Sequence, residues 1–220
     1  MKKYFDVLRR CPLFSDIADA QLLPMLSCLG AKTETYQKAQ TILAEGSPAR
    51  CFGIVLSGAV QIIRMDYDGN RSIMTNLEPS QLFGESFACA EIHDIPVDVV
   101  AAEPTEVMLL DAHRITKSCS NACSFHHQMI FNLMKVVAAK NLAFHRKLEI
   151  TSCRTTREKL LTYLSHAAKE NGSNSFTIPY DRQALADYLG VDRSGLSVEI
   201  GRLRREGILL CEKSHFTLLS

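Results

Sequence analysis

The residues best suited to specific recognition in this sequence are polar side chains between positions 192 and 203. Apolar residues recur there at spacings of three and four, at Leu196, Ile200 and Leu203, which predicts a helix with one buried face. The opposite face carries Arg193, Ser194, Gly195, Ser197, Val198 and Arg202. Arginine can bond both acceptors of a guanine, serine can bond bases or phosphate, and valine can contact a thymine methyl group. This face therefore predicts contact with double-stranded DNA.

A second short helix precedes this one and is expected to support it. Asp181 can cap its start, and Leu185, Ala186 and Leu189 give it one apolar face. Gly190 can supply a left-handed turn, and Asp192 can cap the helix that follows. The arrangement predicts a helix-turn-helix, in which the second helix enters the DNA major groove. An ordinary pair of packed helices is the alternative interpretation.

Two further residues are expected to hold the DNA backbone, and one residue of the reading helix is unusual. Thr177 and Arg182 lie just before and at the start of the first helix, where phosphate contacts are common. Gly195 lies inside the second helix, where glycine costs about 1 kcal/mol relative to alanine. We expect Arg193 to read a guanine and Arg202 to contact the backbone.

Composition sets the class of protein but gives little sign of its partner. The 220 residues include 25 Lys+Arg and 24 Asp+Glu, for a formal net charge of +1. Charged residues interrupt the N-terminus, which argues against a signal peptide, and no apolar run is long enough to span a membrane. We expect a cytoplasmic protein without a membrane partner. Its eight cysteines contain no Cys-x-x-Cys pair and are expected to be reduced thiols.

The pattern of apolar residues predicts an α+β protein with three parts. Residues 1–118 form a short helical entry, broken at Pro24, followed by a β-roll (double-stranded jelly roll) of short strands between about residues 32 and 111. Residues 119–150 form one long helix. Residues 151–220 hold a hinge at 151–156, the helix-turn-helix, and a two-stranded wing between Gly207 and Leu219.

The long helix also predicts self-association. Its apolar stripe is longer than packing on one small domain requires, and such a stripe favours a partner helix. The stripe consists of Ile130, Leu133, Val137, Phe144 and Leu148. Lys140 and Asn141 interrupt it, so we expect a short dimer interface between two copies of the chain.

Three segments carry a resemblance to a known family. They are residues 52–60, with a serine-glycine corner at Ser57 and Gly58; residues 81–85, which contain Phe-Gly-Glu; and residues 181–203. In this order they resemble the cyclic-AMP receptor and fumarate–nitrate regulator (Crp/Fnr) family of bacterial transcription factors. The resemblance implies a homodimer on a palindromic DNA site, a small-molecule effector in the β-roll, and RNA polymerase as a partner if the protein is an activator.

The same resemblance places an effector pocket but argues against cyclic AMP in it. The matching positions are Gly84, Glu85, Ser86, Phe87, Ile95, Pro96, Val97, Phe144 and His145. Members that bind cyclic nucleotides carry Arg-Ser/Thr-Ala where this chain has Ile95, Pro96 and Val97. Because a buried phosphate without a cationic partner is costly, we expect a different, unidentified effector. Cys11, Cys28 and Cys51 are also too scattered for the family's iron–sulfur cluster.

Other chemistries remain as alternatives to a DNA-binding regulator. Cys89 and His93 lie near where haem-dependent relatives place their axial ligands. One alternative is therefore a haem-based gas sensor or a redox sensor of the same family. Cys119, Cys123 and His126 or His127 could share a helical face, but zinc needs a fourth ligand, so no metal site is predicted.

Two further function classes lack their signatures. A cupin-like metal enzyme would need a His-x-His pair, which is absent, and no catalytic triad can be assembled, so we expect no enzyme. A purely structural interaction module would not need Arg193, and loss of DNA binding in an Arg193→Ala protein would separate the two classes.

Overall fold

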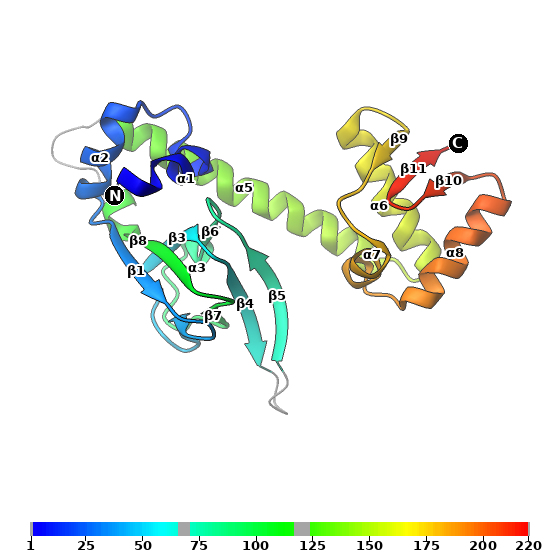
Figure 1. Ribbon diagram of the computed structural model, residues 1–220, viewed down its shortest axis with the longest axis horizontal. Helices are drawn as coiled ribbons and strands as arrows, with labels where there is room; N and C mark the ends of the chain where they lie inside the picture. Colours follow the sequence, from blue (N-terminus) through cyan, green and yellow to red (C-terminus); the bar gives the residue numbers. More distant parts are fainter. Residues whose placement is uncertain (1, 66–70, 117–123, 220) are drawn as a thin grey trace. The chain divides into compact units, whose positions relative to one another are not determined.

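The structure, a computed structural model, describes residues 2–65, 71–116 and 124–219 (Figure 1). The chain divides into two compact units, Met1–Ala139 and Lys140–Ser220. The division falls inside the long helix α5 (Ser124–Ser152), which continues through the boundary as one helix. Among the described residues, no helix combines the length and apolar character that crossing a membrane requires.

The first unit contains the predicted β-roll, built from two antiparallel four-stranded sheets. The strand order is β1-β8-β3-β6 in one sheet and β2-β7-β4-β5 in the other. The strands are β1 (Lys32–Tyr36), β2 (Thr41–Leu43), β3 (Cys51–Ser57), β4 (Val60–Met65), β5 (Arg71–Leu77), β6 (Leu82–Phe83), β7 (Asp98–Ala101) and β8 (Thr105–Asp111). The predicted run of short strands is confirmed.

Strand β3 explains why one of these sheets is buried on both faces. Alternate side chains of a strand point to opposite faces. Phe52 and Ile54 face a core shared with the helices, whereas Val55 faces the interior of the roll. The ring of Phe83 crosses β3 at Gly53, where a Cβ atom would lie 2.0 Å from the ring. Glycine at this position therefore allows β6 to close the end of the sheet.

Helices cover the outer face of that sheet. They are α1 (Phe5–Arg10), α2 (Asp19–Cys28), α3 (Glu85–Cys89), α4 (Ala112–Thr116) and the first half of α5. The prediction that Pro24 breaks the entry helix is wrong, because Pro24 lies inside α2. Proline costs α2 one backbone hydrogen bond, but Met25 and Leu26, which follow it, are fully buried, and their burial outweighs that loss.

The second unit begins with the last turns of α5 and continues into the predicted winged helix-turn-helix. Its elements are α6 (Thr156–Asn171), β9 (Ser175–Thr177), α7 (Arg182–Leu189), α8 (Arg193–Arg205), β10 (Leu209–Glu212) and β11 (His215–Leu218). The three strands form one sheet in the order β10-β11-β9. The predicted wing between Gly207 and Leu219 is therefore a hairpin, extended by β9.

The junction between α5 and α6 is shorter than the segment 151–156 predicted as a hinge. Helix α5 continues through Ser152, and Thr155 already caps α6. The Thr155 hydroxyl accepts from the Glu158 backbone N–H at 3.2 Å, and the Glu158 carboxylate accepts from the Thr155 backbone N–H at 3.0 Å. This reciprocal pair satisfies two backbone donors and fixes where α6 begins.

Side chains of α5 take part in the core of the second unit. Ile150 is 1% exposed and packs with the buried residues of α6, α7 and α8. The Lys147 ammonium lies 3.9 Å from the centre of the Tyr188 ring. Tyr188 stacks on Tyr180 with ring centres 5.0 Å apart, and Tyr163 completes the cluster at 5.4 Å from Tyr188. The last turns of α5 are therefore packed against the helices that follow them.

Candidate DNA-binding surface

The two helices α7 and α8 begin and end where the residue types require it. The Asp181 carboxylate accepts from the Ala184 N–H at 2.8 Å, and the Asp192 carboxylate accepts from the Gly195 N–H at 2.9 Å. Gly190 lies between the helices at a φ of 62°, the left-handed conformation that favours glycine. The caps and the turn predicted from the sequence are confirmed.

Helix α8 divides into a buried face and a solvent-exposed face, as predicted. Leu196 and Leu203 are fully buried, and Ile200 is 4% exposed. The other face exposes Arg193, Ser194, Gly195, Ser197, Val198 and Arg202. Val198 is 60% exposed even though its side chain is apolar. An exposed apolar residue between arginines and serines is what a thymine methyl contact needs.

Both serines of the exposed face already donate hydrogen bonds within the protein. The Ser194 hydroxyl donates to the Asp192 carboxylate, and the Ser197 hydroxyl donates to the Arg193 carbonyl at 3.0 Å. A hydroxyl has one donor hydrogen and two acceptor lone pairs. In these conformations the two serines present acceptors outward, which suits a donor such as the amino group of cytosine or adenine.

The residues expected at the DNA backbone have different surroundings. Arg202 is exposed, and its Nη1 donates to the Glu199 carboxylate at 3.0 Å. Thr177 is exposed on β9, with its hydroxyl 3.0 Å from Nδ1 of His215. Arg182 is half-buried, and its Nη2 lies 3.5 Å from the Cys211 sulfur. Arg202 and Thr177 therefore face solvent, whereas Arg182 packs partly against the wing.

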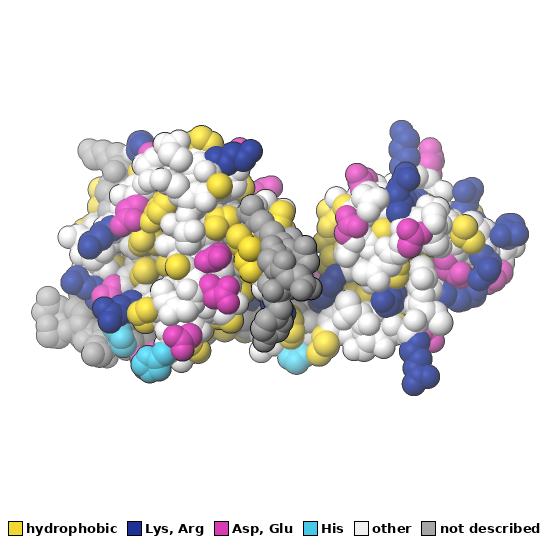
Figure 2. All heavy atoms as spheres, turned by 90° about the horizontal axis from the view of Figure 1, so that it is seen from below, with side chains coloured by type: hydrophobic (Ala, Val, Ile, Leu, Met, Phe, Trp, Pro, Cys, Tyr) yellow, Lys and Arg dark blue, Asp and Glu magenta, His cyan; other side chains and the backbone are white. Residues whose placement is uncertain are grey.

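The surface of the second unit carries both signs of charge. In the view of Figure 2, Lys and Arg side chains project from several sides of this unit, with acidic side chains between them. Arg202, Arg204 and Arg205 gather in the last turn of α8. This mixed surface agrees with the near-neutral charge of the chain, so attraction to DNA has to come from local groups.

The predicted effector residues in the first unit surround the start of α3 and the interior of the roll. Gly84 caps α3 at a φ of 76°, and Glu85, the first residue of α3, is 2% exposed. The Ser86 hydroxyl donates to the Glu85 carboxylate at 3.3 Å. Ile95 and Val97 are buried among the apolar residues between the two sheets, and Phe87 packs against them, whereas Pro96 is exposed.

The remaining predicted residues lie on α5. Phe144 and His145 are exposed and belong to the second unit, as does Leu148. In the first unit, Leu133 is 6% exposed and packs in its own chain's core, whereas Met134 beside it is 58% exposed. Ile130, Met134 and Val137 line an apolar groove together with Ala138, Ile115 of α4 and Cys89 of α3.

The cysteine and histidine candidates are not gathered into a metal site in the part of the chain that the structure describes. Cys89 and His93 are both exposed residues, but the Cys89 thiol itself is partly desolvated, which raises its pKa, and Glu85 adds a smaller effect. His126 is buried in α5. Cys119 and Cys123 lie outside the described residues.

Sequence reasoning missed two polar residues of the second unit. Glu199 lies on the buried side of α8 and is 8% exposed. Its spacing of three from Leu196 could have placed it there, since residues three apart share a helical face. His215 bridges Ser175 and Thr177 across the sheet, with both ring nitrogens 3.0 Å from a hydroxyl. That contact depends on how β9 and β11 pair, and the sequence pattern did not predict this pairing.

Comparisons with known protein families match both units. A family model described as a cyclic nucleotide-binding domain matches residues 33–121. A model of the Crp-like helix-turn-helix domain matches residues 158–220.

Relatives and solved structures agree with these matches. The transcriptional activator protein FnrL of Cereibacter sphaeroides is 20% identical over 201 residues, covering 84% of this chain and 75% of FnrL. The transcriptional activator protein FnrA of Stutzerimonas stutzeri is 23% identical over 188 residues, covering 83% of this chain and 75% of FnrA. The structure of CprK complexed with OCPA has a TM-score of 0.63 at 14% identity and covers 91% of each chain. The c-di-GMP responsive regulator CLP of Xanthomonas campestris has a TM-score of 0.57 at 16% identity, covering 92% of this chain and 100% of CLP.

These matches and the fold define the class of protein. It is a transcriptional regulator that combines a cyclic nucleotide-binding domain with a DNA-binding helix-turn-helix. The chain belongs to the Crp/Fnr family. Helix α8 is the second helix of this helix-turn-helix, the place that a recognition helix takes in the motif.

Proposed function

We propose that this protein is a homodimeric regulator that binds a palindromic operator and responds to an effector other than cyclic AMP. The observation that carries the proposal is the division of α8, which buries Leu196, Ile200 and Leu203 and exposes a polar row beginning at Arg193. In a dimer, two such helices enter successive major grooves, so the half-sites lie about 10 base pairs apart. RNA polymerase is a partner if the protein activates transcription.

Within this proposal each exposed residue of α8 has a role. Arg193 bonds a guanine through two donors, which gives about 1–3 kcal/mol of discrimination at that base pair. Ser194 and Ser197 contact bases as acceptors or, once their hydroxyl hydrogens turn away from Asp192 and the Arg193 carbonyl, phosphate as donors. Val198 contacts a thymine methyl group, and Gly195 lets the backbone approach the groove. Arg202, Thr177 and Arg182 contact the DNA backbone. The family resemblance implies an acidic residue and an arginine at the positions of Ser194 and Val198, so the operator should differ from the best-known family consensus.

The dimer forms through α5 in this proposal. The exposed or groove-lining apolar residues Ile130, Val137, Phe144 and Leu148 form the interface, and Leu133 supports it from the core side. Met134, which is 58% exposed in the same turn as Leu133, extends this interface. Exposed apolar side chains at helical spacing on a long helix support a helix–helix contact.

The parts of the chain have separate tasks in this proposal. Residues 1–118 sense the effector, 119–150 dimerise, and 151–220 bind DNA, with the short junction after α5 as the hinge. The effector lies near Gly84–Phe87 and Ile95–Val97 of the first unit, while Phe144 and His145 of α5 stay predictions from the family resemblance. The apolar side chains of Ile95 and Val97 support a ligand without a buried phosphate, because neither can pair with its charge.

Arg193→Ala tests the DNA-binding part of the proposal. Full-length protein is first used to enrich duplexes from a random-sequence pool, and the best duplex and a scrambled copy are then measured by fluorescence anisotropy. We expect Arg193→Ala to weaken binding to the enriched duplex by about 5- to 150-fold, with little change on the scrambled copy. Equal weakening on both duplexes would make Arg193 a phosphate contact and contradict the assignment.

Two measurements test the effector part. Titration calorimetry with cyclic AMP is expected to give no heat of binding, because Ile95 and Val97 provide no charge for the phosphate. The absorption spectrum of protein purified without oxygen separates a small organic ligand from haem. A Soret band would favour the haem-based alternative, in which Cys89 or His93 is the candidate axial ligand.

A further inference from the structure

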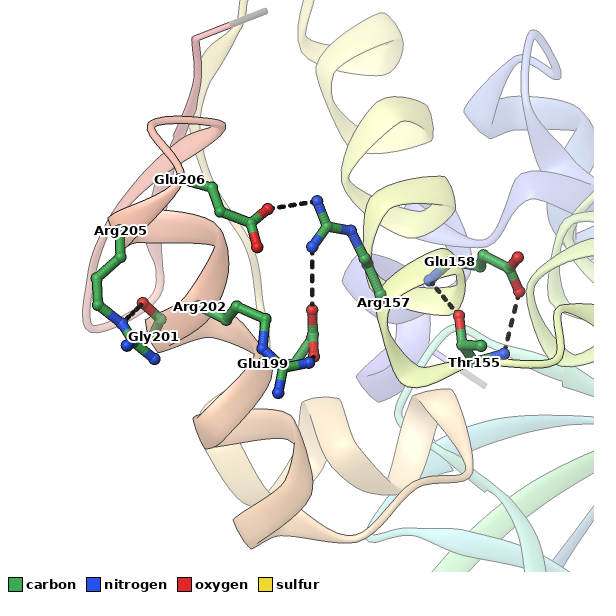
Figure 3. A network of polar contacts seen from close by, with 8 residues as sticks. All are labelled: Thr155, Arg157, Glu158, Glu199, Gly201, Arg202, Arg205 and Glu206. Atoms are coloured by element: carbon green, nitrogen blue, oxygen red, sulfur yellow. Dashed lines mark hydrogen bonds and ion pairs between the residues drawn. The ribbon is translucent and has the colours of Figure 1, made fainter.

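The buried side of the recognition helix contains a carboxylate. Glu199 follows Leu196 and precedes Ile200 in α8, and only 10% of its side chain is exposed. An ionised carboxylate in such a position loses its hydration, and this loss has to be offset by cationic partners. Two arginines from two different helices provide them, as Figure 3 shows.

The two arginines lie beside different oxygens of Glu199, Arg202 by a hydrogen bond and Arg157 by an ion-pair contact. Arg202, one turn further along α8, donates from Nη1 to Oε2 at 3.0 Å. Arg157, in the first turn of α6, places Nη1 3.6 Å from Oε1. Arg157 also donates from Nη2 to the Glu206 carboxylate at 2.5 Å, and this bond lowers the pKa of Glu206. Negative and positive groups therefore alternate from Glu206 through Arg157 and Glu199 to Arg202.

This arrangement restricts Arg202 without burying it. Its side chain is 56% exposed, while the bond to Glu199 engages one nitrogen of the guanidinium. A long side chain that is already ordered loses less conformational freedom when it binds a partner. Arg157 places a positive charge beside the second oxygen of Glu199. Without Arg157, the buried charge would depend on Arg202 alone and would draw that side chain inward.

We propose that Arg157 is a positioning residue for DNA binding, which acts through Glu199 to hold Arg202 at the surface of α8 for contact with a DNA phosphate. The inference rests on the proposed function and adds to it a residue on a helix outside the helix-turn-helix. Arg157 lies two residues after Thr155, the residue that caps α6 at its junction with α5. The network therefore fixes the end of the recognition helix to the start of α6.

A double-mutant cycle on full-length protein tests this role. The variants are Arg157→Ala, Arg202→Ala and the double variant, and the probe is the duplex that wild-type protein enriches from a random pool. We expect each single variant to bind about 2- to 10-fold more weakly and to lower the slope of log K against log salt by up to about 0.9. The double variant should bind no more weakly than Arg202→Ala, since Arg157 acts through Arg202.

Lys169→Ala is the matched control, because it removes one positive charge from the exposed last turn of the same helix. Its affinity and salt slope should stay near those of the wild type. If Arg157→Ala does not fold, Arg157→Lys carries the cycle, since lysine keeps the charge but lacks a fork that spans two carboxylates.

Two results would overturn the inference. One is an equal loss of DNA affinity when Arg157 is substituted in the wild-type protein and in the Arg202→Ala variant. The other is an Arg157→Ala variant that melts at a lower temperature but keeps the wild-type salt slope, which is the signature of a purely structural ion pair. Failure of the wild-type protein to enrich any duplex would overturn the proposed function itself, and this inference with it, so the two failures are distinguishable.

Discussion

At the scale of single residues, Asp192 caps the start of α8. Its carboxylate accepts from the Ser194 hydroxyl and from the Gly195 N–H, and these bonds hold its pKa below the ordinary value of 3.8. A carboxyl group whose pKa is lower in the folded state stabilises the fold above its ordinary pKa. That contribution is lost as the pH falls through the lower, folded value.

We therefore predict that Asp192→Asn makes the protein less sensitive to acid. Asparagine can still cap the helix but does not titrate. Between about pH 5 and about pH 2, the free energy of unfolding should fall less in the variant than in the wild type. Denaturant titrations across this range measure the difference, and parallel curves for the two proteins would contradict the prediction.

Gly195 and Gly201 offer a second test at this scale. Both lie in α8, and a Cβ at Gly195 would meet only Asp192 Oδ2 at 3.8 Å, while one at Gly201 would meet nothing within 4 Å. Because neither glycine is required by internal packing, each change to alanine should stabilise the fold by about 0.5–1 kcal/mol. Only Gly195→Ala should weaken binding to the enriched duplex, since the N-terminal end of a recognition helix enters the groove.

Thermal unfolding and anisotropy measure both effects of these substitutions. Unchanged affinity in Gly195→Ala would show that the helix backbone does not approach the bases there. Weaker binding by Gly201→Ala would place the DNA further along α8 than we propose.

At the scale of elements, α5 contributes to a core at its C-terminal end. Ile150 is 1% exposed, whereas Leu148, two residues earlier, is 51% exposed. Glu149 adds a contact of 3.2 Å to His166 of α6, and Arg146 pairs with Glu170 of the same helix. The last turns of α5 therefore fold with the second unit.

The pair Ile150 and Leu148 tests this assignment. Ile150→Ala should destabilise the second unit by about 2–5 kcal/mol, because it leaves a cavity in a packed core. Leu148→Ala should change the stability of that unit by about 0.5 kcal/mol or less, the usual range for an exposed site. Hydrogen exchange of the α7 and α8 amides measures the effect, and equal protection in both variants would contradict it.

Local signals made part of this fold predictable from the sequence. The caps Asp181 and Asp192 and the turn at Gly190 depend on contacts within four residues, which the sequence contains. Pro24 was misplaced because its effect depends on burial of Met25 and Leu26 in a core assembled from distant elements.

Parts of the candidate site could not be predicted either, because they depend on contacts between elements that are distant in the sequence. The amide of Asn132 is buried and donates to the backbone carbonyls of Leu13 and Ser15 at 3.0 and 2.7 Å. These bonds fix the rotation of α5, so that Leu133 faces the core and Met134 faces outward. Periodicity alone cannot tell which of these neighbouring residues is buried. It also cannot predict the ion pair between Glu199 of α8 and Arg157 of α6.

At the scale of the whole molecule, the proposed dimer depends on the exposed stripe of α5. Phe144 is 64% exposed and Leu142 is 60% exposed, but they lie on nearly opposite sides of the helix. We predict that wild-type protein sediments at twice the chain mass of 24.5 kDa. Phe144→Glu should shift it to the monomer at micromolar concentration, because a charge then enters the apolar interface.

Leu142→Glu is the control for this prediction and should leave the dimer intact. Analytical ultracentrifugation over a dilution series distinguishes the two variants. A Leu142→Glu monomer beside a Phe144→Glu dimer would place the interface on the other side of α5.

The tyrosine cluster of the second unit makes that unit visible to optical spectroscopy. The chain contains six tyrosines and no tryptophan, so its intrinsic emission comes from phenol rings. Tyr163, Tyr180 and Tyr188 lie within 6.2 Å of one another by their ring centres. Closely stacked phenols in a fixed arrangement give a near-ultraviolet circular dichroism signal that vanishes on melting. Unfolding of the second unit can therefore be followed in the unlabelled, unmodified protein.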